Sequence, residues 1–210
     1  MTQIMTPSDK PITDGQIDKA VAAYKAMLVK HRTELASEAA QEVLGQDDYI
    51  NEQVGVLRKR IEAVSKMIIR KVKVDRTKTP QKVLDATSRK QYTDRSVVDS
   101  MPCGVGEDVE VSFFEPEPSE YTRPGYMSDD DLEKALARRG LTADPYAQAK
   151  ANGDNPAFAD THPNGTHWKN GDGKWCFAAF SQWLDVERVV DVDRDGNDWD
   201  GRWWFAGVRK

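Results

Sequence analysis

Two apolar seams in the first third of the chain constrain its fold more than any other feature. The first seam comprises Ile17, Val21, Tyr24, Leu28, His31 and Leu35, and the second comprises Ile50, Val54, Leu57, Ile61, Val64 and Ile68. Members of each seam are alternately four and three residues apart, which is the heptad spacing of coiled-coil helices. Asp14 predicts the start of the first helix, and residues 45–48 predict a turn. We therefore expect residues 1–75 to form an antiparallel, coiled-coil-like helical hairpin.

This hairpin also predicts self-association. Two helices alone bury little surface, so the hairpin should pack either on the rest of the chain or on copies of itself. We expect a homo-oligomer that forms through residues 15–70.

The rest of the chain predicts a second, mixed domain, so the expected fold class is α+β. Residues 76–106 are expected to be a linker with one short helix, and residues 107–210 a tryptophan-rich α+β module. Alternating residues predict a strand over 109–114, and Ser128 and Gly140 mark the start and the end of a helix.

The end of the module predicts an antiparallel β-hairpin. Residues 188–194 alternate with period two, Asp195 and Gly196 form a strong turn sequence, and residues 197–208 return as a strand. All six tryptophans lie between Trp168 and Trp204. The expected inward scaffold comprises Trp168, Trp175, Phe177, Phe180, Trp199, Trp203, Trp204 and Phe205.

Charge is unevenly distributed along the chain, whose formal net charge is −5. Residues 58–95 carry 13 Lys and Arg against 4 Asp and Glu, whereas residues 96–210 carry 12 against 22. The basic stretch could contact phosphate, so a nucleic-acid-binding or host-interfering protein is one alternative. No apolar run approaches the roughly 20 residues of a membrane helix, and the N-terminus lacks the pattern of a secretory signal. We expect a cytoplasmic or virion-associated protein without membrane contact.

The motifs predict no enzyme and no cofactor. The chain has no Gly-rich phosphate loop and no nucleophile elbow. Asp191, Asp193 and Asp195 match the opening of a calcium-binding loop, but Arg202 occupies the twelfth position, where a bidentate Glu is required. A β-hairpin with a polar outer face accounts for the same residues, and calcium remains the alternative.

Residues 144–210 resemble the C-terminal part of the variable proteins of diversity-generating retroelements, many of which come from phages and uncultivated bacteria. The resemblance is carried by three segments, namely residues 166–168 (Thr-His-Trp), residues 175–180 (Trp-Cys-Phe-Ala-Ala-Phe) and residues 203–209 (Trp-Trp-Phe-Ala-Gly-Val-Arg). Between the last two lies a stretch rich in Asp, Asn, Gly and Ser, as error-prone copying at template adenines would produce.

The resemblance implies a C-type-lectin-like fold and a non-catalytic, ligand-binding display protein with a diversifiable surface. Its partner would be a protein or a cell-surface ligand. The implied ligand-binding residues are Ser181, Gln182, Asp185, Glu187, Asp191, Asp193, Asp195, Asn197, Asp198, Asp200 and Arg202. A phage structural protein that assembles through the helical hairpin is the other alternative.

Overall fold

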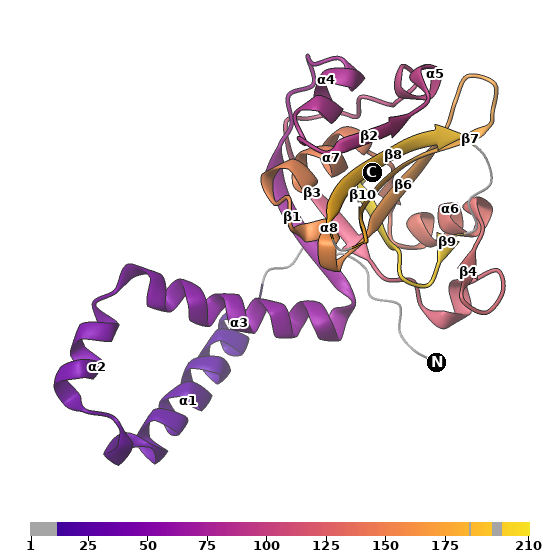
Figure 1. The fold of residues 1–210 in the computed structure, drawn as a ribbon. Coiled ribbons are helices and arrows are strands. Elements are labelled where there is room, and N and C mark those ends of the chain that lie inside the picture. Colours follow the sequence, from indigo (N-terminus) through magenta and orange to yellow (C-terminus); the bar gives the residue numbers. More distant parts are fainter. Residues whose placement is uncertain (1–11, 185, 195–198) are drawn as a thin grey trace. The chain divides into compact units, whose positions relative to one another are not determined.

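The computed structural model describes residues 12–184, 186–194 and 199–210, and it has the mixed α+β composition that the sequence predicts. The chain divides into a helical unit that ends at Ser65 and a compact unit that begins at Lys66 (Figure 1).

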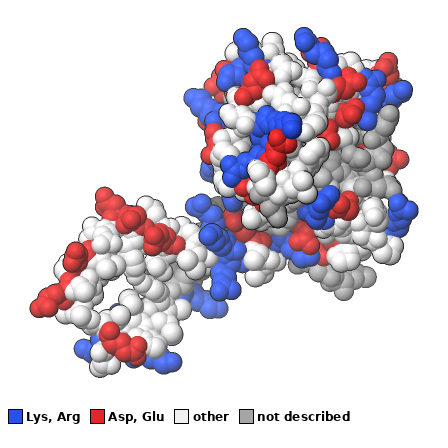
Figure 2. Space-filling view, in the orientation of Figure 1, with Lys and Arg blue, Asp and Glu red and all other residues white. Residues whose placement is uncertain are grey.

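The helical unit consists of three α-helices and a short 3₁₀ turn. Their bounds are α1 Asp14–Lys30, the 3₁₀ turn Arg32–Glu34, α2 Ser37–Leu44 and α3 Asp47–Ser65. The three helices follow one another along a curved path (Figure 1), and α2 contacts α3. Carboxylates gather over α2 and the start of α3 (Figure 2). None of the residues of these helices, all of which the structure describes, is buried.

The start of α1 differs by one residue from the prediction. Thr13, rather than Asp14, is the N-cap, because its hydroxyl accepts from the Gln16 backbone N–H at 3.3 Å. The Gln16 side chain accepts in return from the Thr13 N–H at 2.9 Å, which completes a capping box.

Both seams are shorter than predicted. The first helix ends at Lys30, and a 3₁₀ turn follows in which the His31 ring and the Glu34 carboxylate lie 3.0 Å apart. His31 and Leu35 therefore lie outside α1. Ile68 does not belong to the second seam either, because it is buried in a strand, opposite Phe113.

The compact unit is built on one large mixed sheet with the strand order β1-β3-β10-β6-β7-β8-β2, and β5 pairs with β10. These strands are β1 Met67–Lys73, β2 Lys90–Thr93, β3 Asp108–Phe114, β5 Leu141–Thr142, β6 Asn164–Lys169, β7 Trp175–Trp183, β8 Glu187–Arg194 and β10 Trp204–Arg209. The pairs β10–β6 and β2–β8 are parallel, and the other neighbours are antiparallel. Two short strands, β4 Tyr126–Met127 and β9 Trp199–Asp200, pair separately.

Helices cover both faces of the sheet. Their bounds are α4 Pro80–Asp85, α5 Arg95–Val98, a 3₁₀ turn Pro118–Glu120, α6 Asp129–Arg138, α7 Pro145–Asp154 and α8 Phe158–Thr161. The predicted caps of α6 are confirmed: the Ser128 hydroxyl accepts from the Asp131 N–H, and Gly140 follows the helix with φ 64°.

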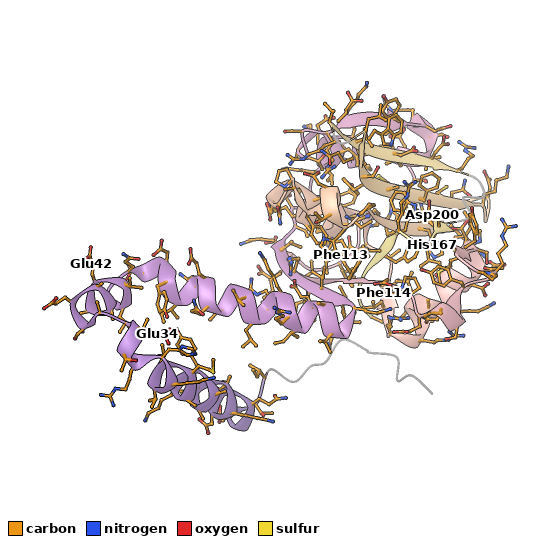
Figure 3. The ribbon with its side chains drawn as sticks, turned by 60° about the horizontal axis from the view of Figure 1, so that its bottom comes forward. Glu34, Glu42, Phe113, Phe114, His167 and Asp200 are labelled. Carbon is orange, nitrogen blue, oxygen red and sulfur yellow. The ribbon has the colours of Figure 1, made fainter. Side chains whose placement is uncertain are left out.

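The sheet separates two apolar cores. Phe113 and Phe114 are neighbours in β3 and enter different cores, because successive strand residues point to opposite faces (Figure 3). The first core contains residues of α4, α5, α7 and α8. The second contains residues of α6, β4 and β9, with Trp199 at 2% exposure.

The compact unit includes segments that the sequence assigned elsewhere. Strand β1 belongs to the sheet, so the boundary lies at Lys66 rather than after residue 75. Residues 76–106, expected as a linker, supply α4, β2 and α5, which bury Val83, Leu84, Val97 and Val98.

The predicted pairing of residues 188–194 with residues 197–208 is wrong. Strand β8 pairs with β7 and β2, whereas β10 pairs with β3, β5 and β6. Strand β10 is a central strand, with β3 on one edge and β6 on the other, and Phe205 and Ala206 on its two faces enter the two opposite cores. Asp195 and Gly196, the predicted turn, lie outside the described residues.

Among the described helices, none combines the length and the apolar composition that crossing a bilayer requires.

Candidate functional site

The second face of the sheet carries an exposed group of side chains at the β7–β8–β2 end. Cross-strand register places Trp183 opposite Glu187 and Tyr92 opposite Asp191, so these residues share one face. Two residues further along β8, Asp193 lies on the same face. We call this group the acidic sheet face, and it comprises Lys90, Tyr92, Trp183, Glu187, Asp191 and Asp193.

Aromatic rings form one half of the acidic sheet face. The rings of Tyr92 and Trp183 lie 4.6 Å apart, centroid to centroid, and Trp183 is 45% exposed. The Lys90 ammonium lies 5.3 Å from the Tyr92 ring and 3.0 Å from a carboxylate oxygen of Glu187. The Glu187 charge is thus balanced locally.

Neighbouring charges on β8 are balanced as well. Arg188 holds the Asp160 carboxylate through its Nε at 3.0 Å and its Nη2 at 2.6 Å. Arg194 lies 3.3 Å from the Asp94 carboxylate. Both cations are therefore committed to other carboxylates.

Asp191 and Asp193 are the charges of this face that remain uncompensated. Within the described part of the chain, neither forms an ion pair with a Lys, Arg or His side chain. Burial, and secondarily the nearby Asp193 carboxylate, raises the pKa of Asp191 above its ordinary value of 3.8. Because both causes disfavour the ionised form, a cation placed between the two carboxylates would be stabilising.

The predicted ligand-binding residues that the structure describes do not all lie on one surface. Ser181, Glu187, Asp191 and Asp193 share the second face of the sheet, whereas Gln182 has the opposite orientation. Asp200 and Arg202 are brought together elsewhere, where they form their own ion pair at 3.0 Å near β9. Asp185, Asp195, Asn197 and Asp198 lie outside the described residues.

The scaffold prediction holds for five residues and is only partly correct for three. Trp168, Phe177, Phe180, Trp199 and Phe205 are buried, whereas Trp175, Trp203 and Trp204 are half-buried. The ring of Trp175 is half-buried because one of its faces stacks on the ring of His167, at a centroid distance of 4.3 Å.

Hydrogen bonds around the buried His167 hold the aromatic rings in this part of the scaffold. His167 is 1% exposed, and its Nδ1 lies 3.1 Å from an oxygen of Asp129. The same oxygen accepts from the Trp199 indole N–H at 3.2 Å, and the Trp175 indole N–H donates to Asp130 at 3.2 Å. The first turn of α6 thereby fixes three rings from three strands.

The described residues do not provide a complete set of ligands for calcium. Asp191 and Asp193 share a face, but the third residue, Asp195, lies outside the described residues. Among residues 12–184, 186–194 and 199–210, no group of three or more His, Cys, Asp or Glu is placed to hold a metal ion.

The basic stretch does not form a continuous cationic strip in the compact unit. Five of its cations already face carboxylates at 2.7–3.3 Å, namely Lys66, Lys71, Arg76, Lys90 and Arg95. A sixth, Arg89, is buried and donates to the carbonyls of Ser181, Val189 and Pro156.

A separate cavity of about 580 Å³ lies beside α4 and α7. Its size suits a small ligand. The charged residues that line it are Lys73, Lys78 and Lys150 together with Asp75, Glu107 and Asp154, so the signs balance. The lining of the cavity therefore favours neither cationic nor anionic ligands, whereas the charges of the acidic sheet face favour a cation.

Sequence reasoning missed Lys90, Tyr92 and Trp183 as members of the candidate site. Lys90 and Tyr92 lie in a segment expected to be a linker, and only their alternation in residues 90–93 could have indicated a strand. The aromatic run before residue 184 predicted a strand, but not which of its ends is exposed.

Fold and surface together define an α+β protein with a scaffold of buried aromatic residues and an exposed, acidic and aromatic sheet face. No protein-family model matches the chain, and neither a curated protein nor a solved structure matches it.

Proposed function

We propose that the protein is a non-catalytic binding protein whose acidic sheet face takes up a cationic segment of a protein partner. The observation that carries this proposal is the pair Asp191 and Asp193, which has no cationic side chain as an ion-pair partner among the described residues, although Asp193 accepts from the Arg194 backbone N–H at 2.7 Å, while the other charges on β8 are compensated. A ligand cation would supply that countercharge and relieve the unfavourable environment of Asp191.

The aromatic half of the face favours arginine as the ligand cation. The Trp183 side chain is 45% exposed next to Tyr92. A guanidinium group is planar, stacks on aromatic rings and pairs with carboxylates through two hydrogen bonds. We therefore expect arginine-containing segments to bind more tightly than lysine-containing ones.

The binding prediction can be measured with an array of immobilised peptides that are arginine-rich, lysine-rich, neutral or acidic. The full chain should bind the arginine-rich peptides, and the double variant Asp191→Asn/Asp193→Asn should lose at least about tenfold in affinity, equivalent to about 1.4 kcal/mol. Binding should also weaken with added salt, and on acidification at a higher pH than an ordinary aspartate would give.

The matched control is Asp108→Asn/Asp172→Asn, which removes two exposed carboxylates from other parts of the compact unit. Its affinity should stay within about twofold of the unaltered chain, because distant exposed charges are screened. Equal losses in the two double variants, or a preference for neutral peptides, would overturn the proposal.

The same face supports a retroelement-diversified display role as the finer proposal. Glu187, Asp191 and Asp193 point away from the first core, whereas Val190 and Val192 fill it. An exposed position such as Asp193 tolerates exchange within about 0.5 kcal/mol, whereas Glu187 and Asp191 are half-buried and have less freedom to vary.

The DNA that flanks the gene tests the display role directly. A reverse-transcriptase gene should lie nearby, together with a near-copy of the gene's 3′ end that differs from it at adenines. Flanking DNA that contains neither would exclude diversification and leave the peptide-binding proposal standing.

A further inference from the structure

The helical unit exposes its apolar seams, although the helices are fully formed. Four α1 residues, Ile17, Val21, Tyr24 and Leu28, are 41–60% exposed. Five α3 residues, Ile50, Val54, Leu57, Ile61 and Val64, are 42–86% exposed. The compact unit, by contrast, buries most of its large apolar side chains in two cores.

Helices of this length need a packing partner. The α-helices contain 17, 8 and 19 residues, so they are only a few turns long, and helix formation has a costly first turn. Most helical stability in proteins comes from covering an apolar face. The Tyr24 and Tyr49 hydroxyls join α1 to α3 by a hydrogen bond, but neither helix, each described in full, has a buried residue. The seams therefore require cover from outside the unit.

The charges along α3 point to a second copy as the cover. Its first half carries Asp47, Asp48 and Glu52, and its second half carries Arg58, Lys59 and Arg60, with Glu62 as the exception. Helix α1 has a weaker polarity of the same sign, with Asp14 and Asp18 before Lys25 and Lys30, and with Lys19 as the exception. An antiparallel copy brings each acidic half level with a basic half, whereas a parallel copy would bring like charges together.

The seams can be compared with a standard protein–protein interface. A standard interface takes about 800 Å² and roughly 20–30 residues from each partner. The helical unit supplies nine seam side chains spread over two helices of 17 and 19 residues. A two-fold axis uses the same patch on both copies, so the self-complementary charge pattern closes the assembly at two.

We infer that the helical unit is a homodimerisation interface in which the α3 seams of two copies pack antiparallel around a two-fold axis between Val54 and Leu57. In this arrangement Val54 of one copy meets Leu57 of the other, and Ile50 meets Ile61. The inference does not depend on the acidic sheet face.

The association test compares two apolar positions of α3. Leu57→Glu places a charge in the seam, whereas Val56→Glu places it at a residue that is 57% exposed and lies off the seam. By sedimentation equilibrium the full chain should be a dimer. Leu57→Glu should raise the dimer dissociation constant at least about hundredfold, and Val56→Glu should leave it within about threefold.

The orientation test uses cysteine cross-linking in a Cys103→Ser background, with Cys176 buried. A mixture of Val54→Cys and Leu57→Cys chains should form a disulfide-linked heterodimer, whereas Val54→Cys alone should link weakly. Efficient linking of Val54→Cys alone would indicate parallel helices and overturn the arrangement. A full chain that stays monomeric at every concentration, or that responds equally to both glutamate variants, would overturn the interface itself.

Discussion

Replacing Arg139 by alanine is expected to lower the free energy of unfolding of the compact unit by about 3–5 kcal/mol. Its guanidinium donates to both carboxylate oxygens of Glu120 at 2.7 Å, and the two side chains are 3% and 0% exposed. The guanidinium also lies 4.1 Å from the Phe114 ring centroid. Removal of Arg139 leaves the buried carboxylate with only the longer contact to the half-exposed Arg138, which is the costly change. Urea unfolding followed by tryptophan fluorescence measures the loss.

Arg138 supplies the matched control. It contacts the same carboxylate at 3.4 Å, but its side chain is 50% exposed, so Arg138→Ala should cost less than about 1 kcal/mol. The double variant Arg139→Met/Glu120→Leu should recover part of the loss, because no charge then remains buried. Equal costs for the two alanine variants would contradict this account of the pair.

The same ion pair gives the pH dependence a definite sign. Burial alone would raise the pKa of Glu120, but the hydrogen bonds and charge of Arg139 outweigh it and hold the pKa below the ordinary value of 4.5. A carboxyl group whose pKa is lower in the folded state than in the unfolded state stabilises the fold at pH values above its unfolded-state pKa. This contribution is lost as the pH falls through the folded-state pKa.

Substitution of Gly165 by alanine is expected to cost about 2–3 kcal/mol. A Cβ atom at this position would lie 2.6 Å from two ring atoms of Trp199, which is 2% exposed and packs edge-to-face against Phe177 and Phe205. The ring cannot withdraw without disturbing the second core. Thermal and urea unfolding of the Gly165→Ala chain should show the loss.

A smaller ring should relieve the clash. Trp199→Phe in the Gly165→Ala chain is expected to cost less than the sum of the two single substitutions, because the atoms that clash are removed. Gly171→Ala is the control, since a Cβ atom at Gly171 would meet no described atom within 4 Å, and its effect should stay within about 0.5 kcal/mol. Strict additivity at Gly165 and Trp199 would rule out the contact as the cause.

Patterns in the local sequence correctly predicted the helices and strands that depend mainly on neighbouring residues. Strand β7 follows from its apolar run, β3 from its alternation, and α6 from the cap at Ser128 and the stop at Gly140. The same reasoning failed for β2, whose four residues include only one aromatic and no aliphatic side chain. That strand exists because it pairs in parallel with β8, and no local pattern encodes this partner.

The candidate site divides in the same way. Glu187, Asp191 and Asp193 were implied by the family resemblance, and period-two alternation independently assigns Asp191 and Asp193 to one face of a strand. Lys90 and Tyr92 were missed, since they reach that face from a segment nearly half the chain away. The hairpin prediction failed for a related reason: a local turn sequence says nothing about the central place of β10 between β3 and β6.

The remote origin of β2 has a consequence for the maturation of the protein. Contacts between distant segments form late, because a long stretch of chain must first be ordered to bring them together. Lys90, Tyr92 and the buried Arg89 join Trp183, Glu187 and the β8 backbone only at that step. A partly unfolded chain thus carries the acidic residues but not the paired surface, so we expect the proposed partner to bind only the folded protein.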